Sequence, residues 1–303
     1  MVKDFQEEII VMLYRLIAGN KRCFKGLSIE DGKIVSLVPR KTLIYAFGPL
    51  FIGDIVKVDQ ENTIVEVQER QNILIRPRVA NLDYAIVVAS TCEPDFSSYL
   101  LDKFLCYLNF CHIPVIIAFT KIDRLNHSKR EEIKKYQEYY ESLGFPSFVT
   151  SKFDTRTIEP IIDRIQGKTV AFMGQTGAGK SSLINAIDKD FNRRIGEYSK
   201  ALGRGKHQTK EVIFFQYLGG LIGDTPGFSS LDFSLLKITS RDLSRIYPGY
   251  EKYALKCYYN DCMHLSEKEC KVKEALEEGR LSKESYDNYL KMLKEIKEGK
   301  RNG

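Results

Sequence analysis

The chain has 303 residues, enough for two domains and a small third one. Apolar residues make up 43% and charged residues 28% of it, a balance that excludes a disordered or collagen-like chain. The formal net charge of +6 permits an anionic partner such as RNA without requiring one. The longest apolar runs, residues 9–14 and 114–119, are far shorter than the roughly 18 residues of a membrane helix, and the acidic N-terminus is unlike a signal peptide. We therefore expect a cytoplasmic protein with no membrane contact.

Residues 1–78 predict a small β domain. Residues 54–58 and 63–67 alternate between apolar and polar side chains, as half-buried strands do, and residues 59–62 have the composition of a turn. A segment bounded by glycines, residues 48–53, leads into the first of these strands. Residues 5–18 are compatible with one helix or with an additional strand.

Residues 79–235 show the pattern of an α/β domain. Nearly continuous apolar runs, typical of buried parallel strands, occur at 85–89, 115–119, 148–150 and 169–173. Apolar residues at helical spacing cover 95–111, and Ser128 with Glu131 forms a capping box that predicts a further helix. Residues 212–217 and 221–222 predict a hairpin at one edge of the sheet. This alternation predicts a sandwich around a parallel sheet.

A phosphate-binding loop stands between a predicted strand and a predicted helix. Residues 174–181, GQTGAGKS, fit the pattern GxxxxGK[ST], with strand 169–173 before them and helical residues 182–187 after them. In this context backbone N–H groups surround a phosphate, Lys180 bridges the β- and γ-phosphates, and the Ser181 hydroxyl ligates Mg²⁺. The expected nucleotide contacts are Gly174, Gln175, Thr176, Gly177, Ala178, Gly179, Lys180, Ser181 and Ser182.

Two motifs indicate that the base is guanine. Residues 120–123, TKID, match the [NT]KxD pattern of Thr120, Lys121 and Asp123, whose carboxylate accepts hydrogen bonds from two guanine donors that adenine lacks. Residues 150–152 resemble a loop whose backbone amide reads guanine O6, which assigns Ser151 and Lys152 to the site. A lone TKxD is also common as a solvated turn. Both motifs, however, end predicted strands, where ligands bind in open α/β sheets.

A third motif, and the order of all of them, indicates a permuted GTPase. Residues 224–227, DTPG, place Asp224 to reach Mg²⁺ through water and the Gly227 amide to meet the γ-phosphate. In a Ras-like GTPase the phosphate loop comes first, whereas here both base motifs precede it and DTPG comes last. The chain is therefore predicted to be circularly permuted, and the segment after Asp224 runs directly into the C-terminal domain. A movement at the γ-phosphate would then be transmitted as a domain motion.

Residues 236–303 predict a mainly helical C-terminal domain with one metal site. Three of the seven cysteines cluster with a histidine as Cys257, Cys262, His264 and Cys270, and a charged segment at 281–298 is expected to be helical. Three thiolates and one imidazole suit a closed, tetrahedral, structural Zn²⁺ site, and the odd cysteine count argues against a disulfide framework. The alternative is a chance group of free thiols.

With these motifs the sequence resembles the RsgA (YjeQ/YloQ) family of circularly permuted GTPases. The resemblance extends from about Gly53 to the C-terminus, through Gly53-Asp54, residues 76–83 (RPRVANLD), residues 203–209 (GRGKHQT), residues 224–228 (DTPGF) and the Cys/His cluster. It implies an N-terminal OB-like β-barrel, a permuted P-loop GTPase domain and a zinc-binding domain. It also implies action in late maturation of the small ribosomal subunit, with hydrolysis stimulated by that subunit.

The catalytic residues are expected in the loop at 203–209. The residue after the DTPG motif is Phe228, which cannot orient a water molecule as the glutamine of Ras-like enzymes does. His207 is the candidate for that role, and the family resemblance implies the same; the alternative is an exposed loop residue that holds RNA. By resemblance, Thr209 senses Mg²⁺ and the γ-phosphate. Lys180 completes the predicted catalytic group.

The expected partners are GTP or GDP, the small ribosomal subunit and its rRNA, with the protein acting as a monomer. Lysines surround the Cys/His cluster and follow the last helix, with Tyr258 and Tyr259 as stacking faces, although interleaved glutamates also fit a solvated helix. One rival reading is an RNA-binding module that uses guanine nucleotide only as a conformational ligand. Another is a metabolite kinase, which would prefer ATP, and Asp123 argues against it.

Overall fold

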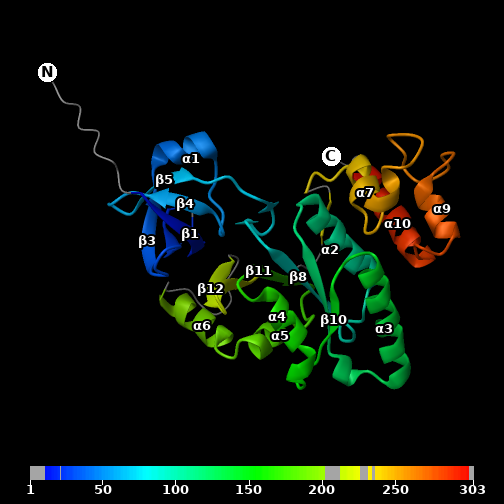
Figure 1. Ribbon diagram of the computed structural model, residues 1–303, viewed down its shortest axis with the longest axis horizontal. Helices are drawn as coiled ribbons and strands as arrows, with labels where there is room; N and C mark the ends of the chain where they lie inside the picture. The colour runs from blue at the N-terminus through cyan, green and yellow to red at the C-terminus, as the bar shows by residue number, and fades with distance from the viewer. Residues whose placement is uncertain (1–10, 21, 202–211, 226–230, 234–235, 300–303) are drawn as a thin grey trace.

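A computed structural model describes residues 11–20, 22–201, 212–225, 231–233 and 236–299, with side chains up to residue 197 in the second of these ranges. The chain forms a β-barrel, a six-stranded α/β unit and a helical module, arranged in that order across the molecule (Figure 1). None of the helices in these ranges has the length and apolar character of a membrane span.

The N-terminal barrel consists of five strands that close in the order β1-β2-β3-β5-β4. They are β1 (Met12–Gly19), β2 (Phe24–Ser28), β3 (Ile34–Pro39), β4 (Ile55–Val58) and β5 (Thr63–Val67), with helix α1 (Lys41–Phe47) between β3 and β4. Alternate residues such as Leu16, Leu37, Val56 and Ile64 are fully buried and form the barrel core. The predicted OB-like barrel is confirmed. Of the undecided segment 5–18, residues 12–18 belong to strand β1, and residues 5–10 lie outside the described residues.

The Gly53-Asp54 pair fixes the end of the barrel. A Cβ at Gly53 would lie 2.0 Å from the carbonyl oxygen of Ala80, so only glycine permits this close approach. The Asp54 carboxylate is fully buried and accepts two hydrogen bonds from Arg70, at 2.6 and 2.7 Å. It also accepts the Phe51 amide at 2.7 Å. This motif is therefore structural. A two-stranded ribbon, β6 (Ile73–Leu74) and β7 (Val79–Ala80), then leads into the next unit.

The central sheet has the strand order β10-β9-β8-β11-β13-β12, with only β12 antiparallel to its neighbour. Its strands are β8 (Tyr84–Ser90), β9 (Val115–Thr120), β10 (Ser147–Val149), β11 (Thr169–Gly174), β12 (Ile213–Tyr217) and β13 (Gly220–Asp224). The four strands predicted from apolar runs and the edge hairpin are confirmed. Because both faces of the sheet are covered, these strands carry continuous apolar residues instead of an alternating pattern.

Helices cover the two faces of this sheet (Figure 1). Strand residues such as Val87 and Phe119 pack toward α2 (Ser98–Phe110) and α3 (His127–Ser142). Their neighbours, such as Val88 and Ala118, pack toward α4 (Glu159–Ile165), α5 (Lys180–Ile187) and α6 (Phe191–Ala201). The capping box predicted at Ser128 is wrong. The Asn126 side chain accepts the Lys129 amide at 2.9 Å, so the helix begins two residues earlier than that box implied.

The C-terminal module is helical, as predicted, and packs on α2. It contains α7 (Ser240–Ile246), α8 (Glu251–Ala254), α9 (Lys271–Glu277) and α10 (Lys283–Gly299), and α7 and α10 lie beside α2 (Figure 1). Buried tyrosines Tyr247, Tyr250 and Tyr289 form its centre, with ring centroids 4.7–5.3 Å apart. The Asn109 side chain of α2 donates to the Ile246 carbonyl at 2.8 Å.

A buried polar network joins this module to the α/β unit. The Asp102 carboxyl of α2 is 1% exposed, and its Oδ1 accepts the Tyr140 hydroxyl of α3 at 2.8 Å. Its Oδ2 lies 2.8 Å from the Tyr247 hydroxyl and 2.9 Å from Nδ2 of Asn288 on α10. The Tyr247 hydroxyl is also 2.6 Å from the Ser285 carbonyl, and it has one proton to donate. The two oxygens therefore compete for it unless Asp102 itself carries a proton and donates to Tyr247.

The barrel is tied to the strand that carries the phosphate loop. Arg15 of β1 donates from Nη1 to Oγ1 of Thr169, the first residue of β11, at 2.8 Å. The Thr169 amide donates to Asp83 at 2.7 Å, so an acidic side chain lies beside the same contact. Burial lowers the pKa of the Arg15 guanidinium, and Asp83 acts in the opposite direction.

Candidate nucleotide-binding and metal sites

The phosphate loop has the geometry that its motif predicts. Strand β11 ends at Gly174, and α5 begins at Lys180 after a loop in which Gly177 and Gly179 have φ of 80° and 90°. A Cβ at Gly174 would lie 2.5 Å from the Val88 carbonyl oxygen, so glycine is also required by space. The free N–H groups at the start of α5 and its dipole make this turn suitable for an anion.

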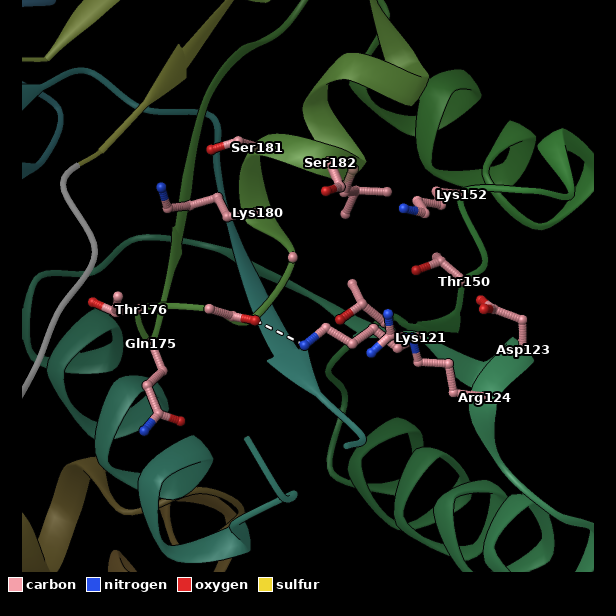
Figure 2. A pocket seen from close by; sticks show the side chains of 14 residues that line it. Lys121, Asp123, Arg124, Thr150, Lys152, Gln175, Thr176, Lys180, Ser181 and Ser182 are labelled. Carbon is pink, nitrogen blue, oxygen red and sulfur yellow. Dashed lines mark hydrogen bonds between the residues drawn. The ribbon is translucent and has the colours of Figure 1, made fainter. Parts of the chain in front are cut away.

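A cavity of about 470 Å³ opens between this loop and the ends of β9 and β10 (Figure 2). Its lining combines residues of the phosphate loop with residues of both predicted base motifs. They are Thr120, Lys121, Asp123, Arg124, Thr150, Lys152, Gln175, Thr176, Gly177, Gly179, Lys180, Ser181, Ser182 and Leu183. Segments 120–124, 150–152 and 175–183 thus meet in one cavity, as their positions at the strand ends predicted.

The base motif is bonded directly to the phosphate loop. Lys121 has the left-handed φ of 65°, and its Nζ donates to the Gly177 carbonyl at 2.8 Å and to the Cys92 carbonyl at 3.1 Å. The Thr120 hydroxyl donates to the Ala178 carbonyl at 2.6 Å and is buried. Threonine therefore makes a supporting hydrogen bond between the two loops. Figure 2 draws the hydrogen bond from Lys121 Nζ to the Gly177 carbonyl as a dashed line.

The second base motif presents Lys152 to the cavity. The Ser151 amide donates instead to the Thr157 hydroxyl at 3.0 Å, and Ser151 is buried in its own turn. Asp123 stands on the same side of the cavity as Lys152, at the end opposite Lys180 and Thr176 (Figure 2). A carboxylate at one end of the cavity and a phosphate loop at the other match the two ends of a nucleotide.

At the phosphate end, Lys180 and Asp224 form an ion pair in which both side chains are largely buried. Asp224 ends β13, which runs parallel to β11 and pairs with it. Burial raises the pKa of the Asp224 carboxyl, while the Lys180 ammonium and the Ser181 side chain act in the opposite direction. The groups predicted to hold phosphate and Mg²⁺ are therefore adjacent.

Several predicted residues lie beside the cavity or outside the described chain. Gly174, Ala178, Ser151 and Asp224 support the lining without forming part of it. His207, Thr209 and Gly227 lie outside the described residues. Conversely, Arg124, Thr150 and Leu183 line the cavity and were not among the predicted contacts. Arg124 directly follows Asp123, and Thr150 is the first residue of the second base motif, so their positions in the chain were the signal that could have identified them.

The four predicted metal ligands are gathered at one point of the C-terminal module. The Sγ atoms of Cys257, Cys262 and Cys270 and one ring nitrogen of His264 all lie within 4.8 Å of one another. From Nδ1 of His264 the three sulfurs are 3.8, 3.4 and 3.3 Å away. A tetrahedral Zn²⁺ with ordinary bond lengths would separate S and N by about 3.5 Å. The cluster fits such an ion.

Neighbouring groups orient these ligands. Nε2 of His264 is 2.9 Å from the Ser244 carbonyl, a contact that places the proton on Nε2 and leaves Nδ1 for the metal. Burial lowers the pKa of the His264 imidazole, which favours the neutral, ligating form. The Glu267 carboxylate accepts the amides of Met263 and Leu265 at 2.8 and 2.7 Å. Tyr286 of α10 donates to the His264 carbonyl at 2.7 Å, so α10 holds the ligand loop.

The fold and the cavity define a P-loop GTPase of circularly permuted topology, in which the base motifs on β9 and β10 precede the phosphate loop on β11 along the chain. The family model for the RsgA GTPase matches residues 67–234. The chain therefore belongs to the RsgA GTPase family, whose members are GTP hydrolases.

Individual relatives agree with this assignment. The chain is 42% identical over 253 residues to the small ribosomal subunit biogenesis GTPase RsgA of Latilactobacillus sakei, covering 82% of this chain and 84% of that protein. It is 41% identical over 254 residues to the protein of the same name from Bacillus subtilis, covering 82% and 85%. The crystal structure of YloQ, a circularly permuted GTPase, superposes with a TM-score of 0.80 at 32% identity over 95% of this chain and 96% of that one. YjeQ from Thermotoga maritima gives 0.79 at 27% identity, covering 95% and 99%.

Proposed function

We propose that this protein hydrolyses GTP in the biogenesis of the small ribosomal subunit and that the subunit stimulates its turnover. The observation that carries the proposal is the single cavity in which Asp123 and Lys121 meet Lys180 and Ser181. It is supported by relatives that are themselves named for this process and align along most of their length.

The residue roles follow from the two ends of the cavity. Asp123 accepts hydrogen bonds from the N1–H and 2-amino groups of guanine, Lys121 packs along the base, and a backbone amide of residues 150–152 reads guanine O6. Lys180 binds the β- and γ-phosphates, and Ser181 ligates Mg²⁺. Lys180 and Asp224 form an ion pair with each other. When GTP and Mg²⁺ bind, Lys180 contacts the phosphates and Asp224 reaches Mg²⁺ through water, so two charge-assisted contacts replace the one ion pair.

Hydrolysis requires residues beyond the cavity lining. We assign the orientation of the attacking water to His207 and the sensing of Mg²⁺ and γ-phosphate to Thr209 and the Gly227 amide. The supporting argument is chemical: Phe228 follows the DTPG motif and cannot hydrogen-bond to water. Slow turnover of the free protein is expected, with acceleration when the subunit binds.

The proposed partner surface combines the barrel and the metal module, with domains at 1–78, 79–235 and 236–303. Tyr258 is 69% exposed and Tyr259 is 44% exposed, with ring centroids 4.9 Å apart, and exposed Lys252 and Lys256 lie close to them in the chain. Stacking faces beside cations suit single-stranded RNA. The Cys257/Cys262/His264/Cys270 cluster holds one structural Zn²⁺ in this proposal, because its ligands leave no open position for catalysis.

The test is nucleotide turnover by the full chain, with GTP beside ATP, in the presence and absence of purified small ribosomal subunits. GTP-selective turnover that rises strongly with the subunit supports the proposal. ATP selectivity with a phosphorylated acceptor would favour a kinase, and GTP binding without response to the subunit would leave an RNA-binding module. His207→Ala is expected to lose the stimulated turnover while keeping subunit binding, which separates hydrolysis from binding.

A further inference from the structure

The loop between β8 and α2 lies against the base motif. Lys121 donates to the carbonyl of Glu93 as well as to that of Cys92, so its ammonium holds two successive peptide groups of this loop. One side-chain contact joins the same segments: Arg124 donates from Nη1 to Oε2 of Glu93 at 2.5 Å. Residues 91–97 and 121–124 are thus tied at two points.

The same loop also reaches the phosphate loop. Pro94 Cδ would be 3.5 Å from a Cβ built on Gly177. Gln175 lines a small pocket together with Asp95 and Phe96. Three loops therefore meet at Lys121, whose Nζ bonds to Gly177 on one side and to residues 92 and 93 on the other. A displacement of loop 91–97 would therefore remove two of the hydrogen bonds that hold Lys121, which lines the nucleotide cavity.

The two ties differ in their exposure to water. Lys121 is half-buried among carbonyl groups. In the Glu93–Arg124 ion pair, by contrast, the side chains are 52% exposed at Arg124 and 78% exposed at Glu93. An exposed ion pair of this kind forms and breaks readily and is weakened by salt. Arg124 lines the cavity directly beside Asp123, and its side chain turns back toward Lys121 (Figure 2). The Glu93–Arg124 ion pair therefore lies at the end of the cavity where the base is expected.

We propose that the Glu93–Arg124 ion pair is a clasp that slows the release of guanine nucleotide, by holding loop 91–97 against the turn that carries Asp123. The proposal rests on the proposed function, because it requires guanine nucleotide in this cavity. It adds two positioning residues to the site. They act on how long the nucleotide stays and not on the choice of base.

The test is the release of N-methylanthraniloyl-GDP from the full-length protein with Mg²⁺, measured by stopped flow after addition of excess GDP. Exposed ion pairs contribute little individually, so Glu93→Gln and Arg124→Leu should each accelerate release by about two- to five-fold. The double variant should release no faster than the faster single variant, because both remove the same contact. Raising the salt concentration should accelerate release from the wild type and leave the double variant nearly unchanged.

A matched control is Glu66→Gln, which removes a comparable exposed ion pair, with Lys57 at 2.9 Å, on the barrel. It should leave the release rate unaltered. Additive effects of Glu93→Gln and Arg124→Leu, or wild-type release that does not respond to salt, would overturn the clasp. A wild-type protein that does not retain N-methylanthraniloyl-GDP would instead refute the guanine-nucleotide site itself, so the two failures are distinguishable.

Discussion

Replacing Asp102 by asparagine should change how stability depends on pH. Asp102 is fully buried between the GTPase unit and the C-terminal module, and burial raises the pKa of its carboxyl from 3.8 to about 6, with Glu284 acting in the same direction. Hydrogen bonds from Tyr140, Tyr247 and Asn288 oppose the rise. The hydrogen-bond geometry independently indicates a protonated Asp102, because its Oδ2 and the Ser285 carbonyl otherwise compete for the single Tyr247 proton.

The direction and size of this pH effect on the free energy of unfolding follow from proton linkage. The folded pKa lies above the unfolded value, so the folded protein binds this proton more tightly, and the resulting stabilisation is full at low pH and is lost as the pH rises through about 6. Between about pH 5 and pH 7.5, this one group lowers the free energy of unfolding by about 1.4 kcal/mol. Asp102→Asn has no such proton, so its stability relative to wild type should rise by that amount over this interval.

The assay is urea unfolding of both proteins at each pH, followed by tyrosine fluorescence, since the chain has 17 tyrosines and no tryptophan. Taking the difference between the two proteins cancels the other titrating groups. A constant difference for Asp102→Asn, or one that moves in favour of wild type as the pH rises, would refute the buried protonated carboxyl.

Three further predictions concern the two candidate sites. Asp123→Asn should weaken GTP binding by about 2–3 kcal/mol, because the acceptor of two guanine donors is lost; titration with GTP and XTP should show a gain for XTP, and equal loss for both would contradict the assigned role. Thr120→Ala removes the hydrogen bond to the Ala178 carbonyl and should weaken GTP binding by about 1 kcal/mol, whereas Thr120→Ser should restore it. Affinity that is the same in all three proteins would argue against that contact. Chelation of the bound metal should unfold the C-terminal module, seen as a loss of far-ultraviolet circular dichroism with release of one Zn²⁺ per chain; a chelated protein that keeps its helices would contradict a structural role.

The features that the sequence indicated most clearly are those whose pattern lies among near neighbours in the chain. The phosphate loop follows from residues 174–181 alone, and the metal ligands lie within one short segment. The parallel strands were recognisable because a strand buried on both faces is apolar throughout. The cap of α3 was misplaced because Asn126 and Ser128 both suit that position, and the path of the preceding loop selects Asn126.

Contacts between segments that are distant in the chain have no local sequence pattern from which they could be predicted. Arg124 and Glu93 are 31 residues apart, and nothing local distinguishes their ion pair from two solvated side chains. Asp102 finds its partners 38, 145 and 186 residues away, so its environment exists only in the folded chain. Strand β1 was also undecided, because its burial pattern includes three consecutive buried residues instead of strict alternation.

Helix α2 makes the three units of this chain less separable than their order suggests. It follows the first strand of the sheet, yet Tyr99, Asp102 and Asn109 bond with residues from the last quarter of the protein. The hydrogen bonds of Asp102 to Tyr247 and Asn288 therefore link an early segment of the chain to its C-terminal helices. A fragment cut after residue 233 would expose this strip of α2, with its carboxylate, to water. The nucleotide-binding unit excised from this protein would accordingly be an incomplete folding unit, and its gene segment could not be transplanted without the helices that complete it.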